Sequence, residues 1–311
     1  MINRPLQTEQ DWWRVRSLLI ESFPLCGPGF NWEIRRWEGG RFHRAEEAWD
    51  AGMFAGVQLW ETDAGRLVGA VHAEGDEIQL QIHPDFRSAI EAEMVAYGED
   101  HFASTNAAGQ RQAHVLAYEQ DTPRRRLLAE RGYVKMPYGW VTRWMRLNHP
   151  VLDEAARPQV PAGYTLRPTY PVGAQGHWAD CQRMADLLNA AFDRPGFHQP
   201  GEYHNFTARA PVFLNELNLV MEAPDGSLAA HAALNYDSAN RYAVFEPVCT
   251  HPQHRRRGLA QMLMLEGIRR ARGVGARIVE VSTGDADAAN ALYDSIPFGE
   301  TYKAYAWKKA W

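Results

Sequence analysis

The segment best suited to chemistry is residues 245–260, FEPVCTHPQHRRRGLA, in which a β-rich run stops at a proline and a short basic loop follows. Apolar residues then recur at helical spacing, namely Leu259, Met262, Leu263 and Ile268. Gly273 ends this pattern. The first turn of a helix leaves backbone N–H groups without intrahelical partners and carries the positive end of the helix dipole. This strand–loop–helix entrance is therefore an anion site, best matched to a phosphate or pyrophosphate. Gly258 lets the backbone approach such a ligand without an intervening side chain.

The elements that position this segment belong to a chain of 311 residues, 45% hydrophobic and 23% charged, which suggests about two domains. No run approaches the ~20 apolar residues of a membrane span, and the N-terminus lacks the apolar stretch of a signal peptide. Three widely spaced cysteines form neither a disulfide framework nor a zinc pattern. A net charge of −5 gives no general nucleic-acid footprint. We expect a cytoplasmic protein without membrane or nucleic-acid partners.

A domain boundary is predicted at the linker 149–162, where three prolines interrupt regular structure. Residues 139–147 before it alternate like a closing strand, and residues 163–168 after it read as an opening strand. The predicted domains are residues 1–148 and 163–311.

Both sides of this boundary follow the same plan. A strand at 77–82 ends in His83-Pro84, and a strand at 242–248 is followed by His251-Pro252, with an arginine three positions after each proline. Each half continues with a helix, a strand, a second helix and a terminal aromatic strand. This order predicts a tandem duplication of one α/β unit.

The second half, 163–311, resembles the GNAT superfamily of acyl-coenzyme A-dependent N-acyltransferases. The family signature, Gln/Arg-x-x-Gly-x-Gly/Ala, is met by Arg255-x-x-Gly258-x-Ala260 at the start of an amphipathic helix. The later alanine-rich stretch with Leu292-Tyr293 resembles the family's second helix.

Two positions depart from the family pattern. Pro297 stands where glycine is usual, and Ala286 stands where asparagine is common. These departures weaken a side-chain contact to the pantetheine arm and leave the Leu-Tyr pair in place.

The resemblance implies an α/β (α+β) fold of two tandem GNAT-like domains, each a mixed, mostly antiparallel twisted sheet flanked by helices. It implies acetyl-CoA as co-substrate and no metal. The strand should offer backbone groups to the acyl carbonyl and the pantetheine amides, and the loop should bind the diphosphate. The implied cofactor-binding residues are Val248, Cys249, Thr250, Arg255, Arg256, Arg257, Gly258, Leu259 and Ala260.

Glu246 is the candidate general base, because it lies in an otherwise apolar run where partial burial would raise its pKa. The alternative is a carboxylate that is solvated or paired with a core arginine. Asp237, Glu280 and a water chain are rival bases.

Tyr293 is the candidate acid for the leaving thiolate, by its match to the family's tyrosine. A tyrosine that merely faces the core is the alternative. Cys249 is interpreted as a small buried residue, because the sequence assigns it no clear histidine partner with a third orienting group.

The first half reads as a degenerate copy with structural and substrate-shaping roles. Ile90 stands at the glycine position, where its side chain would intrude on a diphosphate, and Glu91 would add like charge beside it. Leu128 replaces the tyrosine.

Other candidate sites are weaker. The twelve histidines show no His-Glu-x-x-His or clustered Cys/His spacing. His198 and His204 fall in the segment that corresponds to the acceptor-side loop, where they either contact substrate or lie on the surface. The run Arg124–Arg126 is interpreted as a solvated helix start.

The predicted function is transfer of an acetyl group from acetyl-CoA to the primary amine of a small molecule. One alternative is a non-catalytic, coenzyme A-responsive regulatory module. Another is a tRNA-dependent aminoacyl transferase, against which the acidic pI and the intact loop argue.

Overall fold

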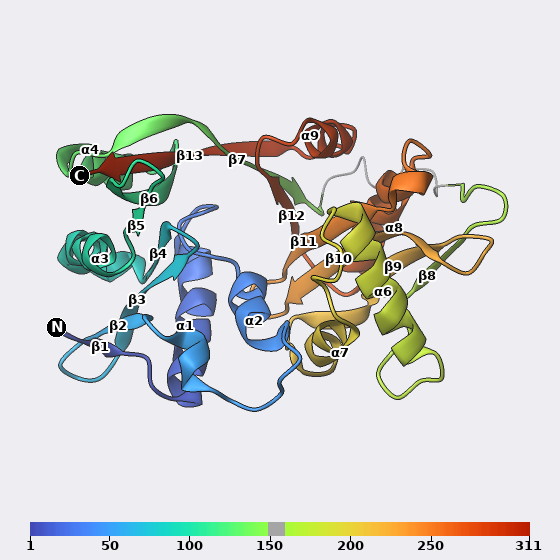
Figure 1. The fold of residues 1–311 in the computed structure, drawn as a ribbon, viewed down its shortest axis with the longest axis horizontal. Coiled ribbons are helices and arrows are strands. Elements are labelled where there is room, and N and C mark those ends of the chain that lie inside the picture. Colours follow the sequence, from blue (N-terminus) through green and yellow to red (C-terminus); the bar gives the residue numbers. More distant parts are fainter. Residues whose placement is uncertain (149–158) are drawn as a thin grey trace.

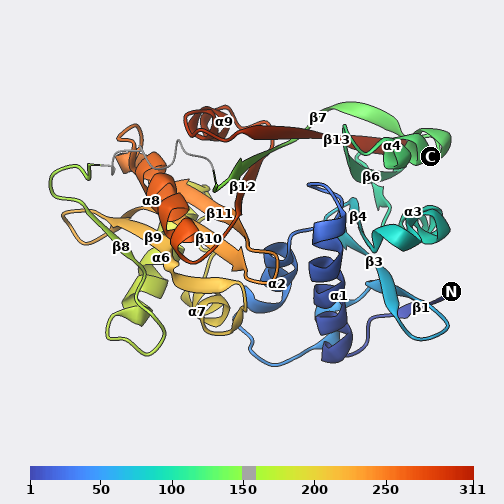
Figure 2. The ribbon, with the colours of Figure 1, turned by 180° about the vertical axis from the view of Figure 1, so that it is seen from behind.

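The computed structural model describes residues 1–148 and 159–311. The strands of this described part form one 13-stranded sheet in the order β1-β2-β3-β4-β6-β13-β7-β12-β11-β10-β9-β8, with β5 beside β6. Neighbouring strands are antiparallel, except that β4 with β6 and β11 with β12 are parallel. Helices flank this open sheet, as Figures 1 and 2 show, so the predicted fold class is confirmed. None of the described helices has the length and apolarity needed to cross a membrane.

The first half contains a helical pair, a sheet and two further helices. Its elements are β1 (Ile2–Pro5), α1 (Glu9–Ser22), α2 (Ile34–Phe42), β2 (Gln58–Glu61), β3 (Leu67–Glu74), β4 (Glu77–Ile82), α3 (Arg87–His101), β5 (Ser104–Thr105), β6 (Arg111–Tyr118), α4 (Thr122–Glu130) and β7 (Val134–Arg146).

The second half repeats this order. Its elements are β8 (Thr165–Pro168), α6 (His177–Ala191), α7 (Pro200–Arg209), β9 (Phe213–Glu222), β10 (Leu228–Asp237), β11 (Tyr242–Thr250), α8 (Leu259–Gly273), β12 (Ile278–Thr283), α9 (Asp287–Asp294) and β13 (Glu300–Ala310). The predicted strand at 77–82 and the predicted helix end at Gly273 are confirmed.

The terminal strand of each half crosses to the other half's sheet. β13 lies between β6 and β7, and β7 lies between β13 and β12. Figure 1 shows the two strands running together from one lobe to the other. Trp307 of β13 packs in the core of the first half, and Met145 of β7 packs in the core of the second. Each half therefore needs the other to complete its core.

The domain limits 1–148 and 163–311 follow the chain and stay a prediction. Most of the predicted linker, residues 149–158, lies outside the described residues.

Candidate active site

Two parallel strands separate at the centre of the second half. β11 and β12 pair only from Tyr242 with Ile278 to Val244 with Glu280, although both strands continue. Beyond Val244, no other strand in the described ranges pairs with that edge of β11, while β10 pairs with the opposite edge as far as Thr250. The stretch Val248–Thr250 therefore has one open backbone edge, which can hydrogen-bond a ligand.

The predicted anion entrance follows directly. The ring of His251 accepts a hydrogen bond from the Gln253 N–H at 3.3 Å and caps a 3-10 turn at Pro252–His254. The loop then turns through left-handed conformations at Arg256 (φ 61°) and Gly258 (φ 72°) before α8 begins at Leu259. No side chain caps α8, so its first-turn N–H groups remain available to an anion.

The three loop arginines differ in their contacts. Arg255 donates to the carbonyl oxygens of Thr250 (3.4 Å) and Ala191 (3.0 Å), which anchors the loop. Arg256 and Arg257 are exposed. Within residues 1–148 and 159–311, none of the three forms an ion pair with a carboxylate, so the loop presents uncompensated positive charge.

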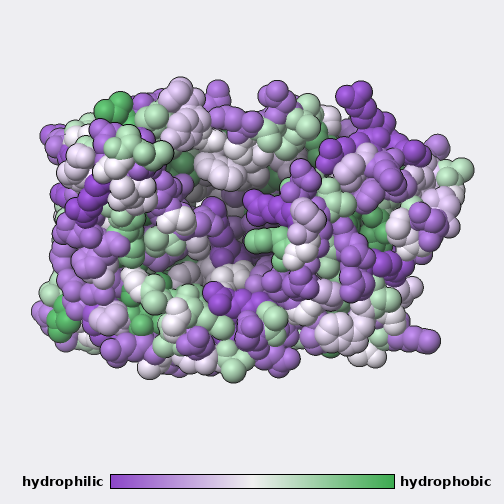
Figure 3. All heavy atoms as spheres, in the orientation of Figure 1, coloured by the Kyte–Doolittle hydropathy of each residue, from purple (hydrophilic) through white to green (hydrophobic). Residues whose placement is uncertain are grey.

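A cavity of about 220 Å³ lies between the two halves. Segment 26–33, β4, β6 and β7 line it from the first half, and β11 and β12 line it from the second. Figure 3 shows the surface hollowed in this central region. Three carboxylates and eight aromatic residues line the cavity, the aromatic residues being Phe23, Phe30, Trp32, Tyr118, Trp140, Trp144, Tyr242 and Phe245. The carboxylates belong to Glu33, Glu246 and Glu280.

Glu246 lies on the cavity wall with its side chain 42% exposed. Its Oε1 atom is 2.7 Å from Nη1 of Arg35, which comes from α2 of the first half. This is the pairing with an arginine that the sequence left open as the alternative to a catalytic role. The assignment of Glu246 as base stays a prediction.

Glu280, on β12, is a half-buried carboxylate on the cavity wall. The indole N–H of Trp144 donates to it, and the Ser282 hydroxyl lies 3.5 Å away. Burial raises the pKa of Glu280, with the nearby Glu246 charge adding to the shift. The third rival base, Asp237, instead accepts the Ala239 and Asn240 N–H groups in the β10–β11 turn, away from the cavity.

Residues 181–296 match a family model described as the Acetyltransferase (GNAT) family. This segment is a GNAT acetyltransferase domain. The match contains the loop 255–258, both separated strands and Tyr293, and it ends before β13.

Solved structures resemble the whole chain. A tandem GNAT protein from the clavulanic acid biosynthesis pathway is 19% identical with a TM-score of 0.64, covering 99% of this chain and 98% of the other. A GCN5-related N-acetyltransferase from Sphaerobacter thermophilus is 20% identical with a TM-score of 0.63, covering 99% and 95%. A GNAT-family acetyltransferase from Colwellia psychrerythraea is 12% identical with a TM-score of 0.62, covering 99% and 100%. The comparison with curated proteins gives no match. The structural likeness confirms the tandem GNAT fold.

In the GNAT domain, Tyr293 lies in α9 and is buried in the second half's core. Burial raises its pKa to about 12, so the phenol keeps its proton at neutral pH. Cys249 is also buried, and burial raises its pKa to about 12, which agrees with a packed thiol rather than a nucleophile.

The first half supplies site residues that sequence reasoning missed. Glu33 lines the cavity, Arg36 lines it as well, and Arg35 holds Glu246. Burial raises the pKa of Glu33 well above its ordinary value, and repulsion from Glu246 adds to this. No local pattern marks these residues, because they meet the GNAT domain only through folding.

Three expectations about the first half need correction. Ile90 does not intrude into a phosphate loop, because α3 begins at Arg87 and carries the Ile90 side chain into the core. Glu91 is buried and pairs with Arg87 and Arg124. Arg124 is thus buried rather than solvated, whereas Arg126 of the same run is exposed.

Neither His198 nor His204 lines the cavity, and His204 lies on α7 rather than in a loop. The backbone N–H of His198 donates to Asn189, and the ring of His204 faces His177 of α6.

Proposed function

We propose that this protein transfers an acetyl group from acetyl-CoA to the primary amine of a small molecule. The observation that carries the proposal is the loop 255–258, which presents free amides and positive charge at the start of α8. A diphosphate bound there would direct the pantetheine arm along the open edge of β11, with the thioester beside Val248–Thr250.

The central cavity supports an amine acceptor. In the part of the chain that the structure describes, Glu33 and Glu280 form no ion pair with a cationic side chain. A protonated amine would offset their charge, and the aromatic walls would favour it further through cation–π contacts. The first half then serves as the acceptor-binding half.

The reaction needs a base more than an acid. An alkylamine has a pKa near ~10.4, so removing its proton at pH 7 costs roughly 4–5 kcal/mol. Glu246 is the proposed base, since it lies two residues before Val248 on the cavity wall. Glu246 takes one proton from the ammonium group, and the free amine then attacks the thioester carbonyl carbon. The carbon–sulfur bond breaks, so that the acetyl group stays on nitrogen and coenzyme A leaves as thiolate. The extra proton on the attacking nitrogen is released to solvent.

Tyr293 suits hydrogen bonding to that thiolate better than full proton transfer. A thiol has a pKa near ~8.5, so moving a proton from a phenol of pKa about 12 is uphill by roughly 5 kcal/mol. A hydrogen bond stabilises the developing negative charge without that cost.

The deciding experiment incubates the protein with labelled acetyl-CoA and a panel of amines, and detects products by mass spectrometry. We expect acetylation of cationic amines over neutral ones of equal size. Coenzyme A binding without transfer to any amine would favour a regulatory module. Transfer only from an aminoacyl-tRNA would favour the aminoacyl transferase alternative.

A further inference from the structure

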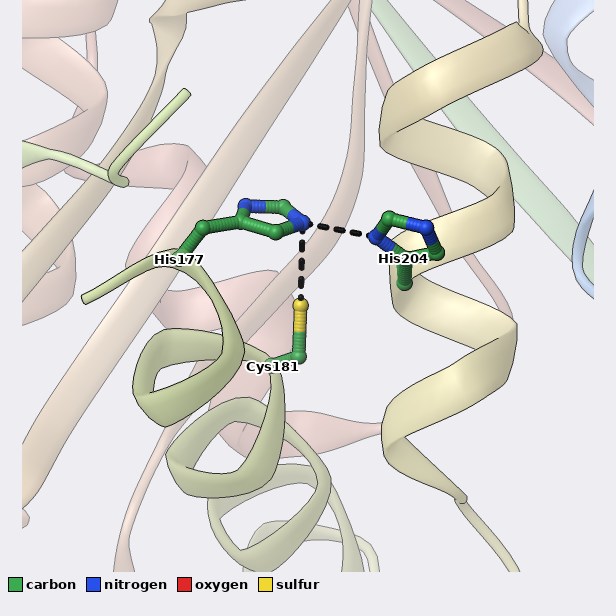
Figure 4. Close-up of side chains that lie close together, drawn as sticks. All are labelled: His177, Cys181 and His204. Atoms are coloured by element: carbon green, nitrogen blue, oxygen red, sulfur yellow. Dashed lines mark hydrogen bonds between the residues drawn. The ribbon is translucent and has the colours of Figure 1, made fainter. Parts of the chain in front are cut away.

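Three metal-ligating side chains converge where α6 and α7 pack, at a place that shares no residue with the central cavity. His177 and Cys181 are one helical turn apart on α6, so they share a face, and His204 faces them from α7 (Figure 4). Nε2 of His177 lies 2.8 Å from Nδ1 of His204 and 3.5 Å from Sγ of Cys181. All three potential ligand atoms lie within 4.8 Å of one another.

A backbone carbonyl fixes the tautomer of His177. Its Nδ1 atom is 3.0 Å from the carbonyl oxygen of Tyr170, and because a carbonyl can only accept, Nδ1 of the neutral ring carries the proton. The lone pair of Nε2 therefore points toward Cys181 and His204. Metal-bound histidines are oriented in this way, with the second ring nitrogen donating to a carbonyl or carboxylate.

The cluster is incompletely satisfied by hydrogen bonds alone. The Cys181 S–H and the His204 Nδ1–H both converge on the single Nε2 lone pair of His177, which can accept only one of them well. His177 and Cys181 are buried, so water does not readily supply the missing partner. The Trp178 ring stacks on His204 at 4.4 Å and holds that ring in place.

We infer that His177, Cys181 and His204 bind one divalent transition-metal ion, for which Zn²⁺ fits the two-imidazole, one-thiolate donor set. Tetrahedral zinc places two nitrogens about 3.3 Å apart, and a nitrogen and a sulfur about 3.6 Å apart. The observed N···S distance of 3.5 Å already agrees. The N···N distance of 2.8 Å must widen, which a rotation of the half-buried His204 ring allows.

Binding changes the protons in a defined way. The Cys181 thiol releases one proton to solvent, and the proton of His204 moves from Nδ1 to Nε2, which leaves Nδ1 free to coordinate. A water molecule takes the fourth position from the side of the half-buried His204, the one ligand that solvent reaches. The ion would fasten α6 to α7, whose Asn205 donates to the carbonyl oxygens of Arg44 and Ala45 in the first half.

Titration of the purified protein with Co²⁺ tests the site, because a thiolate bound to Co²⁺ gives a near-ultraviolet charge-transfer band. We expect one equivalent to bind with that band, and Zn²⁺ to displace it. Cys181→Ser should abolish the band, and His204→Gln should weaken binding at least about 100-fold. Cys26→Ser and His198→Ala, which change a cysteine and a histidine outside the cluster, should leave both unchanged.

Two results would overturn the inference. One is a wild-type protein that binds no Co²⁺ or Zn²⁺ at micromolar concentration. The other is a folded Cys181→Ser variant with an unchanged band. If that variant does not fold, His204→Gln decides the question, since its ring is half-buried, and unweakened Co²⁺ affinity in that variant would exclude the site.

Discussion

The two halves share a chain path up to the start of one helix and then differ. His83 and His251 lie 168 residues apart, and each ring accepts the N–H two residues later and caps a 3-10 turn. In the first half α3 begins at once, at Arg87, which is the equivalent of Arg255. In the second half four loop residues, 255–258, precede α8.

These four residues separate a structural helix start from an anion site. Arg256 and Gly258 adopt left-handed conformations that expose the α8 amides, whereas residues 87–90 are helical. In the first half the charged groups at this corner pair with one another: Arg87 and Arg124 with Glu91, and Arg87 also with Asp121. One α/β frame can therefore either satisfy its own charges at this corner or leave them for a ligand.

The largest expected effect is on the stability of the first-half corner. Arg124→Ala removes a buried guanidinium 2.7 Å from Glu91 and should lower the free energy of unfolding by about 3 kcal/mol, near the lower end for a broken buried pair because Arg87 still pairs with Glu91. Urea unfolding measures this. The matched control is Arg126→Ala, whose pair with Glu130 is fully exposed and should make no measurable contribution. Equal losses in the two variants, or a folded Arg124→Ala protein that no longer binds coenzyme A, would contradict this division of roles.

The next effect concerns ligand affinity in the second half. Gly258→Val forces a β-branched residue into a left-handed conformation at φ 72° and should weaken coenzyme A binding at least about 100-fold, or roughly 2.7 kcal/mol. Isothermal titration calorimetry measures the change. Gly226→Val is the control, because Gly226 has φ 81° in an open turn and carries the same strain away from the loop. Similar affinities in the two variants would remove the loop as the binding site.

The two halves should also differ in catalysis, because only the second half carries the proposed base. Glu246 has Ile78 as its first-half equivalent at the same 168-residue offset, and both line the cavity. Glu246→Gln should lower kcat by about 100-fold while coenzyme A affinity is kept. The exposed Glu216→Gln serves as the control.

The pH profile of the Glu280→Gln variant tests whether Glu280, rather than Glu246, is the general base. Because burial raises the pKa of Glu280, its protonation as the pH falls begins above the ordinary glutamate range. If Glu280 were the base, its variant would lose both the low-pH limb and turnover, whereas Glu246→Gln would remain active. That outcome would move the catalytic role from β11 to β12.

Much of the fold followed from local patterns. Strand 77–82, the end of α8 at Gly273 and the two His-Pro turns are set by alternation, glycine and proline, which act over a few residues. The exchange of β7 and β13 did not follow, because either terminal strand satisfies the same alternation in either half. The packing of Trp307 and Met145 in the cores of the opposite halves accompanies the observed pairing.

The site residues that lie in one short segment could be predicted from the sequence, and those that come from distant segments could not. The loop 255–258 lies in one segment, and its glycine was found from the sequence. Glu33 lines the cavity and Arg35 pairs with Glu246, both from more than 200 residues away, and no spacing rule connects them to Glu246. The sequence did not predict that His177, Cys181 and His204 lie together, because His204 lies on a different helix and the spacing of the three matches no metal motif.

The smallest expected effect is on the stability that a surface ion-pair cluster gives to α8. Arg269 and Arg270 both donate to Glu266 at 2.7 Å, and chiefly the Arg269 hydrogen bonds lower its pKa to about 2. Glu266→Gln should therefore cost under about 1 kcal/mol of unfolding free energy at pH 7. Since the folded-state pKa lies below the ordinary value of 4.5, the carboxylate stabilises the fold fully above pH 4.5, and this contribution is lost as the pH falls toward 2. Urea unfolding of both proteins across this range should show the difference shrinking, with Glu216→Gln showing none. A difference that stayed constant or grew on acidification would show that the ionised carboxylate is not the source of the stabilisation of α8.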